Sequence, residues 1–203
     1  MANESPSATG ARAAGGQPMM FMVGAIGGFV LALASALEFL RFFKVALPGA
    51  AMMAVAVLMA LGAIALGLGF WAVGKTHDNA LAKVAGVLFV LFGVLCVTPL
   101  LGQASAAVAI YGIYGLFAIG ALAFAAGGAA VAKSGEVWGK WSKIVYGGFF
   151  AVAAYQVFQL VTLLVRMNLP VNVIQIVSIA FLVAQVAGLG AAGLALWGMR
   201  ESK

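Results

Sequence analysis

Long apolar stretches separated by short polar connections dominate this chain. A helix needs roughly 20 apolar residues to cross the hydrocarbon core of a bilayer. Six stretches fit that requirement, at residues 18–40, 49–74, 81–101, 105–132, 144–166 and 171–198. The pattern therefore predicts an all-α fold, an integral membrane bundle of six transmembrane helices with no room for a soluble domain.

Composition agrees with this pattern and excludes an ordinary soluble domain. The chain is 65% hydrophobic and 8% charged, whereas about half of a soluble domain is apolar. Residues 1–17 are rich in Ala, Ser and Gly and are predicted to be a disordered cytoplasmic tail. They lack the basic segment of a signal peptide, so the first helix is expected to be retained. Residues 18–199 then form the transmembrane domain and 200–203 a cytoplasmic C-terminus.

Basic residues are distributed unevenly across the six-span topology. Eight fall on the side of the two termini: Arg12, Lys75, Lys83, Lys133, Lys140, Lys143, Arg200 and Lys203. Three fall on the other side: Arg41, Lys44 and Arg166. Short loops rich in Lys and Arg stay in the cytoplasm. Both termini are therefore predicted to be cytoplasmic, with Asn79 and Lys140 in connections that are accessible from that side.

The four tryptophans fall at the same predicted interface. They are Trp71, Trp138, Trp141 and Trp197. Indole rings favour the headgroup layer of a bilayer. All four are therefore predicted to be interface anchors that contact membrane lipids.

The spans are spaced like three two-helix hairpins. Apolar runs begin near Val23, Val84 and Val145, which are 61 residues apart each time. A basic residue also precedes a proline by four positions at both Lys44 and Arg166. Two explanations stay open, an internal duplication or the regular spacing that short loops impose on any six-span protein.

This hairpin spacing, together with the run from Gly93 to Pro99, resembles the HdeD-type acid-resistance membrane proteins. The resemblance covers the architecture of most of the chain and includes no specific motif. It implies a six-span protein of the bacterial inner membrane, without enzymatic activity. It assigns a role to no individual residue.

Polar residues recur at steps of three and four in the first, fifth and sixth helices. Such spacing places each set on one helical face. Amides and carboxylates that face lipid would lack hydrogen-bond partners, so the three faces are expected to meet in one polar seam. Its members are Glu38, Arg41, Gln156, Gln159, Arg166, Gln175 and Gln185. Glu38 is expected to pair with Arg41 on its own helix or with Arg166 across the seam.

Two interpretations of the seam lead to two functions. In the first, its hydrogen bonds fix which helices pair, and the chain is a structural or accessory component of a membrane assembly. Small-residue steps such as Gly24 and Gly28 favour this interpretation, because they allow close helix packing. In the second, the seam is hydrated, and the chain is a small channel or carrier for an ion, proton or small solute. The second rests on Glu38, since ionisable groups within membranes mark functional sites.

Catalytic, metal and cofactor sites are not expected. The chain has one cysteine, Cys96, and one histidine, His77, which is too few for a thiolate or imidazole metal site. It contains no nucleophile elbow and no phosphate-binding glycine loop. No basic cluster with interleaved aromatic residues indicates nucleic acid. Expected partners are lipids, further copies of the chain or other membrane subunits.

Overall fold

The computed structural model describes residues 9–40, 49–98, 106–165 and 170–201. Its described residues contain helices and no strand. The long helices are α1 (Thr9–Leu40), α2 (Gly49–Thr76), α3 (Ala80–Cys96), α5 (Ala106–Lys133), α7 (Ser142–Val165) and α8 (Val171–Glu201). A short turn of α-helix, α6 (Gly135–Trp138), and a 3-10 turn, η2 (Gly139–Trp141), connect α5 to α7.

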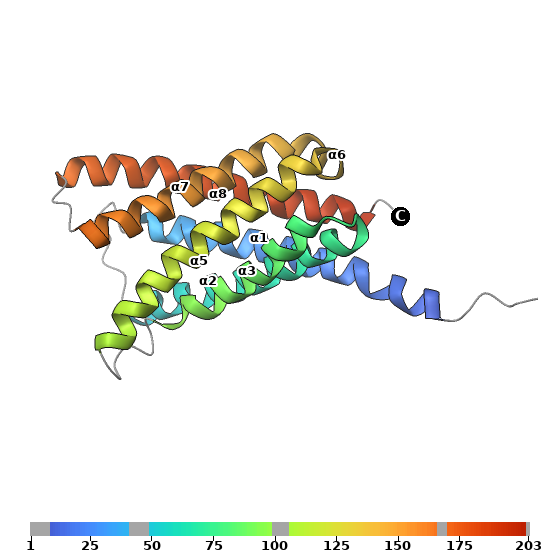
Figure 1. The fold of residues 1–203 in the computed structure, drawn as a ribbon, viewed down its shortest axis with the longest axis horizontal. Coiled ribbons are helices and arrows are strands. Elements are labelled where there is room, and N and C mark those ends of the chain that lie inside the picture. Colours follow the sequence, from blue (N-terminus) through green and yellow to red (C-terminus); the bar gives the residue numbers. More distant parts are fainter. Residues whose placement is uncertain (1–8, 41–48, 99–105, 166–169, 202–203) are drawn as a thin grey trace, which may run out of the picture.

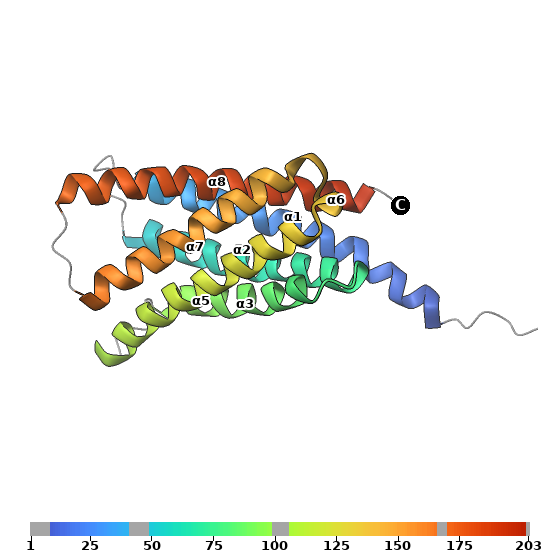
Figure 2. The same ribbon diagram turned by 45° about the horizontal axis from the view of Figure 1, so that its top comes forward.

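The long helices form a closed ring. Each packs on the next in the order α1, α2, α3, α5, α7 and α8, and α8 packs back on α1. Figures 1 and 2 show the helices running side by side along the long axis of the molecule. A closed ring gives every helix an inward face, which is where the side chains of the core lie.

Five helical segments of the described chain are long and apolar enough to cross a membrane. They are Gln17–Glu38, Gly49–Thr76, Ile110–Lys133, Gly135–Val165 and Asn172–Glu201. The protein is therefore a helical membrane bundle. The third predicted span, 81–101, is the shorter helix α3, which has 17 residues. Residues 99–101 of that span lie outside the described residues, and six complete spans and a hairpin repeat stay predictions.

The first helix begins earlier than the sequence predicts. α1 starts at Thr9, so residues 9–17, assigned above to a disordered tail, are helical. Three alanines in this segment favour a helix and three glycines oppose it, so propensity alone does not explain the extension. Pro18 lies inside α1, although proline removes a backbone hydrogen bond there. Residues 1–8 lie outside the described part of the chain.

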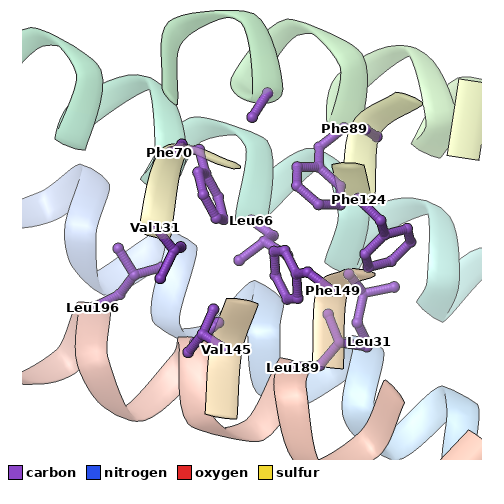
Figure 3. Packing of buried hydrophobic residues seen from close by; sticks show 14 of the residues in the cluster. Leu31, Leu66, Phe70, Phe89, Phe124, Val131, Val145, Phe149, Leu189 and Leu196 are labelled. Carbon is purple, nitrogen blue, oxygen red and sulfur yellow. The ribbon is translucent and has the colours of Figure 1, made fainter. Parts of the chain in front are cut away.

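Four phenylalanine rings fill the centre of the ring of helices. Phe70 of α2, Phe89 of α3, Phe124 of α5 and Phe149 of α7 are each 0% exposed, and Figure 3 shows them gathered together. The centroids of Phe70 and Phe149 are 5.8 Å apart, so the cluster joins α2 to α7 across the ring. Phe89 and Phe124 meet edge to face at 5.1 Å, a favoured aromatic geometry.

Helices approach closely at positions where two glycines face each other. A Cβ atom added to Gly148 of α7 would lie 2.6 Å from the Cα atom of Gly188 on α8. One added to Gly28 of α1 would lie 2.9 Å from the backbone nitrogen of Gly193 on α8. Lipid supplies no hydrophobic force between helices, so close van der Waals contact has to hold them together. These two glycine contacts thus serve packing within the chain.

Asn79, in the turn between α2 and α3, forms hydrogen bonds to the end of α5. Its Oδ1 accepts from the backbone N–H of Ala82, which caps α3. Its Nδ2 donates to the Ala130 carbonyl at 3.1 Å and to the Ser134 hydroxyl at 3.1 Å. Asn79 is therefore buried, which corrects the expectation that it is accessible in its loop.

The residue before it, Asp78, is exposed and has a positive φ of 43°. Its carboxylate accepts a hydrogen bond from the ammonium group of Lys83, with an N–O distance of 2.9 Å. That hydrogen bond and charge lower the pKa of Asp78 below its usual value. The exposed positions of this turn are thus His77 and Asp78.

Candidate functional site

The polar seam expected from the sequence is centred on α8. The first and fifth predicted helices, now α1 and α7, pack on α8 as its two neighbours in the ring. Ser178, Leu182 and Gln185 are all buried along α8, as their spacing of three and four residues requires. The seam therefore divides into an α1–α8 part and an α7–α8 part.

In the α1–α8 part, Gln185 bonds Ser35. The Nε2 of Gln185 donates to the Ser35 hydroxyl at 2.8 Å. Ser35 is 0% exposed and Gln185 is 6% exposed. A buried amide without such a partner would cost about 1–3 kcal/mol. This bond therefore fixes the rotation of α1 against α8.

In the α7–α8 part, a chain of three polar groups crosses the interface. The Tyr155 hydroxyl of α7 donates to the Ser178 hydroxyl of α8 at 3.0 Å. The Gln159 amide, one turn further along α7, donates to the same tyrosine oxygen. The Tyr155 ring stacks on Phe181 of α8 with centroids 5.2 Å apart. Tyr155 was missing from the seam residues chosen from the sequence, although a deep tyrosine needs a hydrogen-bond partner.

Gln156 belongs to another interface. A Cβ atom added to Gly120 of α5 would lie 3.3 Å from the carboxamide carbon of Gln156 and 3.0 Å from the Phe92 ring. Gln156 thus faces α5 and not α8. It lies seven residues, or two helical turns, beyond Phe149 on the inward face of α7. Its Oε1 is buried and has no hydrogen-bond partner among the described residues.

The charged members of the seam are only partly described. Glu38 lies near the end of α1 and is half-buried. Both of its expected partners, Arg41 and Arg166, lie outside the described residues, so either pairing stays a prediction. Gln175 lies half-buried in the first turns of α8.

Three of the four tryptophans carry a cation over the ring. Lys75 lies 5.6 Å from the Trp71 centroid, and Lys140 lies 5.2 Å from that of Trp141. The guanidinium of Arg200 lies 4.8 Å from the Trp197 ring. These pairs occur where α2 and α8 end and where η2 lies, at one end of the bundle in Figure 1.

Trp138 differs from the other three tryptophans. It is 1% exposed and packs on Phe70 with centroids 5.1 Å apart. Its indole ring therefore closes the phenylalanine core at this end. Trp138 is thus not an exposed anchor on the lipid-facing surface, as was predicted for all four tryptophans.

Metal-ligating residues do not gather in the described residues. No group of three or more His, Cys, Asp or Glu side chains lies close enough there to hold a metal ion. Cys96 is buried near the end of α3 as a free thiol.

Comparison with protein-family models, curated proteins and solved structures found no match. The resemblance to HdeD-type proteins therefore stays a prediction. The function has to be inferred from the geometry of the seam and of the core.

The Ser35–Gln185 bond predicts a measurable coupling between α1 and α8. Ser35→Ala and Gln185→Leu are each expected to destabilise the bundle, because each removes a partner from a buried group. The double variant should lose less unfolding free energy than the two single variants lose together. The difference, the coupling energy, is expected to be about 0.6–1.7 kcal/mol, as for other interhelical hydrogen bonds. Reversible unfolding in mixed SDS micelles measures all three variants. Strictly additive losses would show that the two side chains do not stabilise each other.

Proposed function

We propose that this protein is a non-enzymatic structural or accessory component of a membrane assembly. The observation that carries the proposal is the filled interior, where the four buried phenylalanine rings meet across the ring of helices. A permeation path along the axis of the ring would have to displace these rings. In a structural protein, in contrast, such a packed core stabilises the arrangement of the helices.

The hydrogen bonds of the seam support the same proposal. Ser35 pairs with Gln185, and Gln159 reaches Ser178 through Tyr155. Polar groups that bond one another across helix interfaces need no water to satisfy them. The seam then sets the pairing of α1, α7 and α8, which is a structural role.

The outer face of α8 offers a surface for a partner helix. Gly190 and Ala187 lie one turn apart, and Ala187 is exposed. A Cβ atom added to Gly190 would meet no described atom within 4 Å. Small residues that face outward allow a second helix to approach closely. The proposed partner is a transmembrane helix, from another copy of this chain or from another subunit.

Gly190→Leu tests this surface. The variant is expected to lose the assembly that wild-type protein forms in native membranes, while its own unfolding midpoint stays unchanged. The readout is the mass of the complex extracted at native expression level, with Gly147→Leu on the outer face of α7 as the matched control. An assembly that survives Gly190→Leu, or a wild-type protein that is monomeric in its membrane, would contradict the proposal.

A carrier or channel is the second candidate, and one observation favours it. The Oε1 of Gln156 is buried without a described partner, in the half of the bundle that contains Glu38. Such an oxygen could bind a solute or a water molecule. Gln156→Leu separates the candidates, because a scaffold keeps or gains stability when an unpaired amide is replaced. A carrier would instead lose solute-dependent thermal stabilisation and flux in proteoliposomes.

We also propose that the protein resides in a bacterial inner membrane with both termini in the cytoplasm. The uneven distribution of basic residues supports this orientation, and the resemblance to HdeD-type proteins supports the bacterial inner membrane. In a Cys96→Ala background, single cysteines at His77 and Lys140 are expected to react with an impermeant maleimide from the cytoplasmic side only. Both residues are exposed, whereas the buried Asn79 is unsuitable for labelling. Labelling of either cysteine from outside intact cells would contradict the proposed orientation.

A further inference from the structure

A hollow of about 280 Å³ lies between the α6–η2 turn and the last turns of α8. Residues 137–141 form one wall, and Leu194, Ala195, Gly198 and Met199 form the other. The α8 wall is apolar. It is separate from the polar seam and from the outer face of α8 at Gly190, so its role does not depend on the structural function proposed above and rests only on the proposed cytoplasmic orientation of this end.

One wall of the hollow contains an unused hydrogen-bond donor. Trp138 lines the hollow, and its Nε1 is buried without a hydrogen-bond partner among the described residues. Buried indole N–H groups usually find an acceptor, and leaving one unpaired costs about 1–3 kcal/mol. An acceptor oxygen that reaches this nitrogen from the hollow would remove that cost.

One cation, Lys140, lines the hollow, and cations outnumber carboxylates among the described residues at this end of the bundle. Lys140 is exposed. Described cations at this end are Lys75, Lys83, Lys133, Lys140, Lys143 and Arg200, and described carboxylates are Asp78, Glu136 and Glu201. Asp78 is already bonded to Lys83. The surplus of cations therefore favours an anionic occupant.

We propose that the hollow binds the headgroup of an anionic phospholipid. The phosphate oxygens would accept from the Trp138 indole and from the Lys140 ammonium, and the glycerol and first acyl carbons would cover Leu194 and Ala195. Basic pockets at the cytoplasmic ends of membrane helices suit such headgroups. A free phosphate ion would leave the apolar wall uncovered, which is why a lipid is the better occupant.

Native mass spectrometry of the purified full chain tests the site with phosphatidylglycerol and phosphatidylcholine as competing probes. Wild-type protein is expected to retain one phosphatidylglycerol in preference to phosphatidylcholine. Lys140→Gln should lower that retention about fivefold, the effect of about 1 kcal/mol for a lysine near a lipid surface. Trp138→Phe should also lower it, because it deletes the N–H and keeps a ring against Phe70.

Lys75→Gln is the matched control. Lys75 also lies over a tryptophan at this end of the bundle, but it is not among the residues that line the hollow. It should leave retention unchanged. Equal retention of the two lipids, or an equal loss in Lys75→Gln and Lys140→Gln, would overturn the site and indicate diffuse surface attraction. Displacement of the lipid by millimolar inorganic phosphate would also overturn it, in favour of a free-anion site.

Discussion

Gly148→Leu is expected to prevent native assembly of the helix ring, whereas Gly147→Leu should leave it intact. An added Cβ atom at Gly148 would lie 2.6 Å from the Gly188 Cα atom, 2.8 Å from the Ala184 carbonyl oxygen and 3.0 Å from the Gly188 nitrogen. All three are backbone atoms, so no side chain can rotate away. We expect a loss of about 3 kcal/mol or more, at the upper end of overpacking costs.

The neighbouring glycine provides the control for this prediction. Gly147 is exposed, and a Cβ atom there would meet no described atom within 4 Å. Both substitutions replace glycine by leucine at adjacent positions of one helix, so intrinsic helix propensity changes equally. Unfolding in SDS-containing micelles compares the two variants. If Gly148→Leu unfolds at the wild-type midpoint, α7 and α8 do not cross at this pair of glycines.

The second large effect is expected at Phe149. Its ring lies 5.8, 5.8 and 5.3 Å from the rings of Phe70, Phe89 and Phe124. Phe149→Ala leaves a cavity where three other helices meet. We expect the free energy of unfolding to fall by about 2–3 kcal/mol. The cost of the cavity remains in a membrane protein, but the cost of moving the ring into water does not arise, because the unfolded state stays in lipid.

Phe150→Ala is its matched control. Phe150 is 43% exposed on the adjacent position of the same helix, where lipid chains can fill the space that the ring leaves. Unfolding of both variants under identical conditions separates core packing from lipid contact. A cost for Phe150→Ala that equals that of Phe149→Ala would show that the phenylalanine cluster does not hold the ring together.

The sequence predicted the helices well, because each span must satisfy its backbone hydrogen bonds internally and be apolar over its length. α2, α7 and α8 begin and end within a few residues of the predicted bounds. α1 begins nine residues before the predicted span. Residues 9–17 contain three alanines and three glycines, so helix propensity gives no signal for this extension.

The seam was predictable as a set of positions but not as a set of contacts. Spacing placed Ser178 and Gln185 on one face of α8, where both are buried. Spacing could not predict that Gln156 of α7 packs against α5, because a periodicity shows which residues share a face and not which helix that face contacts. Asn79 carried a usable signal, since an asparagine just before an apolar helical run is a typical N-cap. Its bonds to Ala130 and Ser134 depend on tertiary contact and have no local pattern.

The role of phenylalanine was also concealed in the sequence. In a chain of this hydropathy, an inward and an outward phenylalanine look alike, as the neighbours Phe149 and Phe150 illustrate. Lipid-facing and core-facing residues are both apolar, so the contrast that identifies a soluble core is missing. Only the closure of the ring shows which face of each helix is turned inward.

The central claim is that the interior of the helix ring is packed and dry. Water-edited solid-state NMR of the protein in bilayers measures how fast magnetisation passes from water to each side chain. We expect slow transfer to the Gln156 and Gln185 amides, as slow as to the Phe149 ring, and fast transfer to His77 in its exposed turn. Transfer to the Gln156 and Gln185 amides as fast as that to His77 would show a hydrated interior and would contradict a purely structural role.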